Sequence, residues 1–80
     1  MEKIIRGKIK KNMLIEEWAD NQLAGVFVAT VKKGSYIEIY ITQNTLNHIE
    51  VEMVEGKKIK MGMIGIVTPL NKILNNIEIG

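Results

Sequence analysis

Residues 26–42 read VFVATVKKGSYIEIYIT and contain two runs of strand-forming residues on either side of a polar turn. In the second run, isoleucine alternates with tyrosine, glutamate and threonine, which is the period-two pattern of a β-strand. Lys32 to Ser35 are polar or small and include a glycine, as is typical of a turn. The stretch therefore predicts a β-hairpin with strands at 26–31 and 36–42.

This predicted hairpin has apolar side chains on both of its faces. A loop of two or four residues would pair Thr30 with Ile37, Val28 with Ile39, and Val26 with Ile41. The opposite face would then carry Phe27, Tyr36, Glu38 and Tyr40, together with Ala29 and Val31. A solvated face of an antiparallel pair usually alternates to polar residues. We therefore expect a helix of the same chain or a second copy of the protein to cover this face.

The length and composition of the chain limit what it can be. Eighty residues predict one domain spanning 1–80, and a chain this short buries only roughly 60–65% of its unfolded surface. The absence of cysteine excludes disulfides and thiolate chemistry. It also suits a reducing compartment, so a cytoplasmic location is expected. The sequence contains neither an apolar run of membrane-spanning length nor a signal-peptide pattern, so no membrane partner is expected.

Basic residues gather near the start of the chain. Residues 3–10 read as a strand on which Arg6, Lys8 and Lys10 share one face, and Gly7 inside it predicts a bulge or a close approach of another backbone. Lysines on strands often stay in solvent and oppose aggregation; a phosphate-binding surface is the alternative. A net charge of only +2 and a single arginine weigh against that alternative.

Two helices are predicted. Asn12 is a suitable N-cap and Gly25 a suitable C-terminal residue for a helix over 13–24, with Leu14, Trp18 and Leu23 on its buried side. Thr68 and Pro69 favour the start of a second helix near the C-terminus. The last residues, 77–80, could form a short strand instead of continuing this helix.

A second hairpin is predicted between 49–54 and 58–63, around Glu55 to Lys57. The expected inner pairs are Met53–Ile59, Val51–Met61 and Ile49–Met63. This register places Glu52 opposite Lys60 on the outer face, a favourable cross-strand charge pair. Gly62 and Gly65 lack the pattern of a phosphate-binding loop and predict a bend or a close approach of another chain.

No residue pattern signals catalysis. The chain has one histidine, His48, one aspartate and no cysteine, and the spacing supplies neither a nucleophile with its base nor a set of metal ligands. We expect no enzyme activity, metal or cofactor. An oligomer that pairs His48 with a carboxylate of a neighbouring subunit is the remaining enzymatic alternative.

The sequence thus predicts an α+β fold: a small single domain with five or six mostly antiparallel strands in two hairpins plus edge strands, and two short helices. The leading functional hypothesis is a non-enzymatic protein-interaction domain that forms homo-oligomers through the face of Phe27, Tyr36, Glu38 and Tyr40. The alternative is a module that binds single-stranded nucleic acid, RNA in the first place. It would use Arg6, Lys8 and Lys10, with Tyr36 or Tyr40 stacking on bases if the two strands are neighbours.

Overall fold

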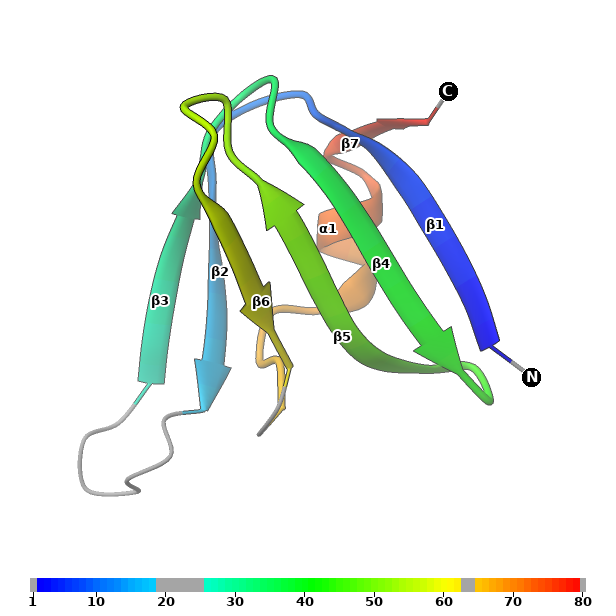
Figure 1. Ribbon diagram of the computed structural model, residues 1–80. Helices are drawn as coiled ribbons and strands as arrows, with labels where there is room; N and C mark the ends of the chain where they lie inside the picture. The colour runs from blue at the N-terminus through cyan, green and yellow to red at the C-terminus, as the bar shows by residue number, and fades with distance from the viewer. Residues whose placement is uncertain (1, 19–25, 63–64, 80) are drawn as a thin grey trace.

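The computed structural model describes residues 2–18, 26–62 and 65–79, apart from the side chains of Val26 and Phe27. Strands dominate these residues, and one short helix lies near the C-terminus (Figure 1). The elements in chain order are β1 (Glu2–Ile9), β2 (Met13–Trp18), β3 (Val26–Val31), β4 (Tyr36–Thr42), β5 (Thr45–Glu52), β6 (Lys58–Met61), α1 (Leu70–Leu74) and β7 (Ile77–Ile79).

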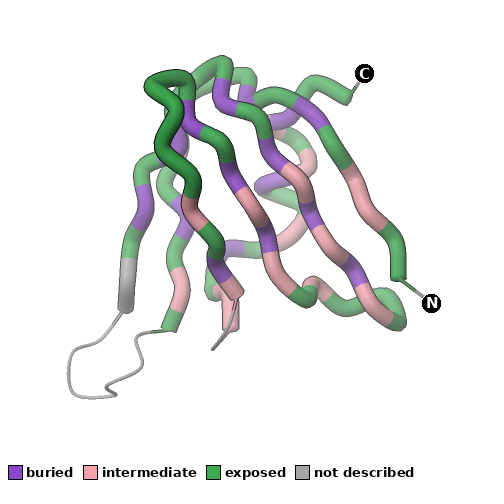
Figure 2. Tube along the Cα trace, viewed as in Figure 1, coloured by how far each residue is buried: buried purple, intermediate pink, exposed green. Residues whose placement is uncertain are grey.

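The described strands form two antiparallel sheets. Five strands lie in the order β6-β5-β4-β1-β7, and β2 pairs with β3 in a separate two-stranded sheet. The helix α1 lies behind the larger sheet (Figure 1). Buried residues alternate with partly exposed ones along β4 and in the second half of β5 (Figure 2), as expected of strands with one face on a core.

The segments 2–18 and 26–42 form one long antiparallel ribbon that bends from one sheet into the other. In the larger sheet Lys8 pairs with Tyr36, and in the smaller sheet Met13 pairs with Val31. The same number of residues separates Lys8 from Met13 as separates Val31 from Tyr36. The pairing register therefore continues unchanged through the bend. The ribbon therefore lines the core from two sides.

The bend is where the predicted first hairpin fails. Its strands at 26–31 and 36–42 are present, but the prediction that they pair with each other is wrong: β3 pairs with β2, and β4 lies between β1 and β5. Gly34 has a φ of +88°, and its N–H donates to the carbonyl of Ile9 at 2.8 Å. The side-chain oxygen Oδ1 of Asn12 accepts from the N–H of Lys33 at 2.8 Å. Lys32 to Ser35 thus turn the ribbon onto the other sheet.

The helix predicted over 13–24 is wrong where the structure describes it. Residues 13–18 form β2, and residues 19–25, which include Leu23 and Gly25, lie outside the described part of the chain. Ile15 is fully buried, while its neighbours Leu14 and Glu16 are exposed, which is the alternation of a strand. On the edge of β2 away from β3, Trp18 N–H donates to Gly65 O at 3.0 Å. Pairing on both edges decides the conformation of this segment.

The turn between β4 and β5 is tight. Only Gln43 and Asn44 separate the strands, and their φ values of 53° and 64° are those of a two-residue hairpin loop. Tyr40 pairs with His48, whereas Ile41 pairs with Leu46, so Asn47 is an extra residue in β5. This bulge lies beside Gly62, where an added Cβ would approach the carbonyl oxygen of Asn47 to 2.7 Å.

The second predicted hairpin is confirmed as β5–β6, but its predicted register is wrong by two residues. Ile49 pairs with Met61 and Glu50 with Lys60. Gly56, with a φ of +93°, donates its N–H to Met53 O at 2.8 Å and closes a turn that lies one residue earlier in the chain than the expected one. A shift of two residues leaves each side chain on its expected face. The predicted partner Met63 lies outside the described residues.

The core fills the space between the two sheets and α1. Its buried apolar residues are Ile9, Ile15, Ala29, Val31, Ile37, Ile39, Ile41, Ile49, Val51, Met53, Met61, Ile73 and Ile77. The predicted C-terminal helix is confirmed as the short α1, and the alternative of a final strand is confirmed as β7. Thr68 does not cap α1; its hydroxyl accepts a hydrogen bond from the Glu16 N–H at 2.8 Å and ties the chain to β2.

Gly7 marks the close approach that its position in a strand predicts. A Cβ added there would lie 2.6 Å from the carbonyl oxygen of Glu78 in β7. Within the described segments, α1 is too short to cross a membrane, and no other helix has the length and apolar character for it.

Candidate interaction surfaces

The outer face of the five-stranded sheet is charged. Cross-strand pairing aligns its side chains in rows, and the first row holds Arg6, Glu38, Glu50 and Lys60. The next row holds Lys8, Tyr36, Glu52 and Lys58. Basic side chains from β1 and β6 therefore flank the acidic side chains of β4 and β5.

A network of polar contacts joins the centre of this face. Arg6 Nε donates to Glu38 Oε2 at 2.7 Å, and the Tyr40 hydroxyl donates to Glu38 Oε1 at 3.4 Å. The rings of Tyr40 and His48 stack with centroids 4.2 Å apart. His48 Nε2 lies 3.1 Å from Glu50 Oε2. The network links β1, β4 and β5. Of the predicted site residues it contains Arg6, Glu38 and Tyr40.

Two pKa values are shifted in this network. Burial raises the pKa of the Tyr40 phenol, and the negative charges of Glu38 and Glu50 raise it further. The hydrogen bond to Glu38 raises the pKa of the Arg6 guanidinium. Both shifts favour the protonated side chains, and these are the forms in which Tyr40 and Arg6 donate hydrogen bonds to Glu38.

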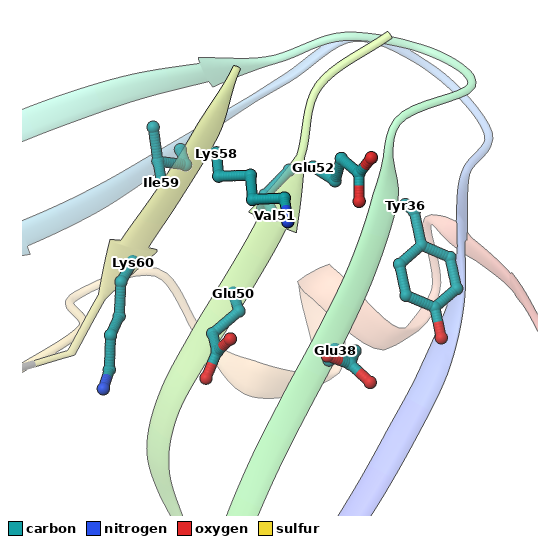
Figure 3. Close-up of a pocket in the computed structure, with 8 residues that line it drawn as sticks. All are labelled: Tyr36, Glu38, Glu50, Val51, Glu52, Lys58, Ile59 and Lys60. Carbon is teal, nitrogen blue, oxygen red and sulfur yellow. The ribbon is translucent and has the colours of Figure 1, made fainter. Parts of the chain in front are cut away.

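A shallow hollow of about 240 Å³ lies on the same face. In Figure 3 the carboxylates of Glu38 and Glu50 lie on neighbouring strands, between the ring of Tyr36 and the amine of Lys60. The hollow offers charged groups of both signs and an aromatic edge. Among the described residues, its lining contains no serine, threonine, cysteine or histidine.

The structure separates the residues of the predicted interface. Tyr36, Glu38 and Tyr40 share the outer face of β4, as the alternation predicts. Phe27 lies in β3 in the other sheet, opposite Glu17, and its side chain is outside the described part of the molecule. Val31, expected beside Tyr36, is fully buried. The predicted pairing that would set Phe27 and Val31 beside the tyrosines is therefore wrong, because β3 and β4 belong to different sheets.

The predicted basic strand is β1, and it lies beside β4 as the nucleic-acid hypothesis requires. Lys8 is opposite Tyr36, but Arg6 is opposite Glu38 and bound to it. Lys10 follows the end of β1, and its N–H donates to Asn76 O at 2.8 Å. Glu38, Glu50 and Glu52 on the same face oppose the binding of phosphate groups.

An apolar surface that sequence reasoning missed lies on the outer face of the β2–β3 ribbon. Leu14 and Trp18 are each 56% exposed on β2, and Val28 is 46% exposed on β3. Glu16 lies between them, directly opposite Val28. The period-two alternation of Leu14, Glu16 and Trp18 could have revealed this surface. The capping residues Asn12 and Gly25 favoured a helix instead, which placed Leu14 and Trp18 in the core.

A groove of about 430 Å³ borders this ribbon on the side of β2. Its walls come from β2 and from the segment before α1, where Val67 N–H donates to Glu16 O at 2.8 Å. The lining residues are Asn12, Met13, Leu14, Glu16, Val67, Thr68, Pro69 and Lys72. The groove extends the exposed apolar surface toward Val67, which is 41% exposed.

Within the described residues, no group of three or more His, Cys, Asp or Glu side chains is arranged so that it could hold a metal ion. Comparisons of the chain with protein-family models, with curated proteins and with solved structures gave no match.

Proposed function

We propose that the protein is a small, non-enzymatic interaction domain that self-associates through the β2–β3 ribbon. The observation that carries the proposal is the exposure of Leu14, Trp18 and Val28 on one face of this two-stranded sheet. A small domain gains stability when a second copy covers surface of this kind. The expected interface is therefore the β2–β3 ribbon and not the outer face of β4.

Charge distribution supports this choice of surface. The outer face of the larger sheet carries charged side chains in the rows of Arg6 and Lys8, and Arg6 already binds Glu38. Burying such a face costs free energy because charged groups lose their hydration. The ribbon face offers apolar side chains with a single acid, Glu16, and therefore costs less to bury.

Sedimentation equilibrium at micromolar concentrations tests the proposal. We expect the wild-type protein to form dimers and Val28→Lys to remain monomeric, because the substitution adds a charge at the centre of the ribbon. Val54→Lys is the matched control: Val54 is also an exposed valine, but it lies in the turn between β5 and β6. A monomeric wild-type protein, or equal assembly of the two variants, would contradict the proposal.

Binding of single-stranded RNA is the second candidate function, and the adjacency of Lys8 and Tyr36 favours it. Such binding would weaken steeply with salt, and Lys8→Ala would weaken it more than Lys57→Ala in the turn after β5. A filter-binding measurement with a labelled RNA at about 50 mM salt decides this candidate. Absence of binding there would rule it out.

A further inference from the structure

We infer that two copies of the chain join edge to edge through β3, forming a continuous four-stranded sheet in the order β2-β3-β3-β2. This inference rests on the proposed self-association and specifies its geometry: the edge of the ribbon makes the contact, and of the exposed apolar residues Val28 on β3 lies at it, while Leu14 and Trp18 on β2 stay in solvent. The starting observation is that β3 pairs only with β2 in the described part of the chain, so its other edge lies open at the side of the molecule (Figure 1).

The backbone groups on that open edge follow from the hydrogen bonds of β2. Trp18 N–H donates to Gly65 O and Glu16 O accepts from Val67 N–H, so these two residues direct their backbone groups away from β3. Backbone groups alternate in direction along an antiparallel strand. Met13, Ile15 and Glu17 therefore bond to their partners Val31, Ala29 and Phe27. The N–H and C=O groups of Val26, Val28 and Thr30 point to the open edge.

A two-fold axis at Val28 would satisfy all of these groups. In an antiparallel pair centred there, Val28 of one copy faces Val28 of the other, and Val26 faces Thr30. Each facing pair can exchange two backbone hydrogen bonds, because all three residues direct both groups outward. The same strand supplies both sides of the contact, as the self-complementarity of a two-fold dimer requires.

The sequence of β3 lacks the features that usually protect an open edge. Its six residues include no charge, no proline and no glycine. The β6 edge of the larger sheet differs, because Lys58 and Lys60 lie on it. Of these two edges, β3 is the one suited to pair with another strand.

Glu16 favours edge pairing over the packing of one ribbon face on another. It is exposed and lies opposite Val28, at the middle of the apolar face. Two such faces packed about a two-fold axis at this point would bring two carboxylates together away from water, which is unfavourable. In the edge-to-edge sheet, β2 lies outside β3 in each copy, so the Glu16 side chains remain apart and in solvent.

Thr30→Pro tests the inference while leaving Leu14, Trp18 and Val28 unchanged. Proline removes the outward N–H of Thr30 without removing a bond to β2, and each dimer loses two hydrogen bonds. We expect the dissociation constant in sedimentation equilibrium to rise about tenfold. Thr30→Ala is the matched control, because it keeps the amide, and it should dimerise like the wild type. Equal dimerisation of Thr30→Pro and Thr30→Ala would overturn edge pairing.

Disulfide trapping gives a second readout that does not depend on how the proline variant folds. The natural chain has no cysteine, so Val28→Cys and Glu16→Cys each introduce a single thiol. Edge pairing places the two thiols of the Val28→Cys dimer in adjacent strands, and those of the Glu16→Cys dimer three strand spacings apart, about 14 Å. We expect covalent dimers from Val28→Cys alone. If the wild type dimerises, covalent dimers of Glu16→Cys or their absence from Val28→Cys would overturn the edge geometry. A wild-type protein that stays monomeric would overturn the self-association itself.

Discussion

The ring of Tyr40 stacks on the ring of His48, with centroids 4.2 Å apart and planes inclined by 11°. Tyr40 and His48 are cross-strand neighbours in β4 and β5, and both contact a carboxylate, Glu38 and Glu50 respectively. The stack occupies one face of each ring. The contact therefore joins β4 to β5 within the chain. The stacked faces of the two rings are not available to a ligand.

The raised pKa of Tyr40 predicts a loss of stability in alkaline solution. In the unfolded chain the phenol titrates near pH 10.0, and in the folded protein its pKa is higher. The folded state therefore keeps the proton where the unfolded state has lost it. The stabilisation is complete below pH 10.0 and disappears as the pH rises through the folded pKa.

Urea unfolding at a series of pH values, with Tyr40→Phe beside the wild type, checks this prediction. The wild-type free energy of unfolding should fall more steeply than that of Tyr40→Phe above the normal tyrosine pKa. Tyr36→Phe is the control, since it removes the other tyrosine on the same strand. Identical slopes for the wild type and Tyr40→Phe would show that Tyr40 does not cause the loss.

Gly7→Ala should destabilise the protein by about 1–3 kcal/mol. The new Cβ would lie 2.6 Å from the Glu78 carbonyl oxygen, which is backbone and cannot move without disturbing the pairing of β1 and β7. Urea denaturation measures the change in unfolding free energy. Lys8→Ala changes the next, exposed residue and should stay within about 0.5 kcal/mol. Equal stabilities of the two variants would mean that β7 does not lie against Gly7.

Ile39→Ala should cost about 2–5 kcal/mol, because Ile39 is completely buried in the central strand of the larger sheet. Leu14→Ala should change the stability by no more than about 0.5 kcal/mol, because Leu14 is 56% exposed on β2. Thermal or urea unfolding of both variants compares them. A large effect of Leu14→Ala would favour the helix with Leu14 in the core over the strand β2.

Thr68→Val should cost about 1 kcal/mol despite its similar shape. Thr68 is only 7% exposed, and its hydroxyl accepts the hydrogen bond of the Glu16 N–H at 2.8 Å. Valine would leave this donor without its partner. Thr45→Val, at an exposed position in β5, is the control, and its unfolding free energy should match the wild type. Similar losses in both variants would count against a specific role of the Thr68 hydroxyl.

The strands of this fold can be predicted from the sequence more readily than their partners. The alternation in residues 36–42 marks β4 because one of its faces is core and the other is not. The same alternation cannot show that β4 pairs with β1, since the bend at Gly34 moves the chain to another sheet. The register of β5 and β6 cannot be predicted for a related reason. The turn between them closes at Gly56, and a register shifted by two residues would leave every side chain on the same face of the sheet.

The segment 13–18 shows how pairing between distant residues overrides a local signal. Asn12 resembles a helix cap, but its side chain accepts from Lys33 N–H across the bend. Glu16 and Trp18 bond to residues far along the chain, Thr68 and Gly65. These partners are invisible to local patterns. The sequence therefore predicts the interaction surface on β4, whereas Leu14, Trp18 and Val28 lie exposed together on β2 and β3.

Amide hydrogen exchange of Val28 and Thr30, followed by NMR at increasing protein concentration, tests the central claim most directly. Both N–H groups point to the open edge of β3, so they exchange with solvent in a monomer and are protected in an edge-paired dimer. Self-association through β3 predicts that their exchange slows as the concentration rises, while the amide of the exposed turn residue Val54 does not change. Exchange of Val28 and Thr30 that stays fast at every concentration would contradict the claim.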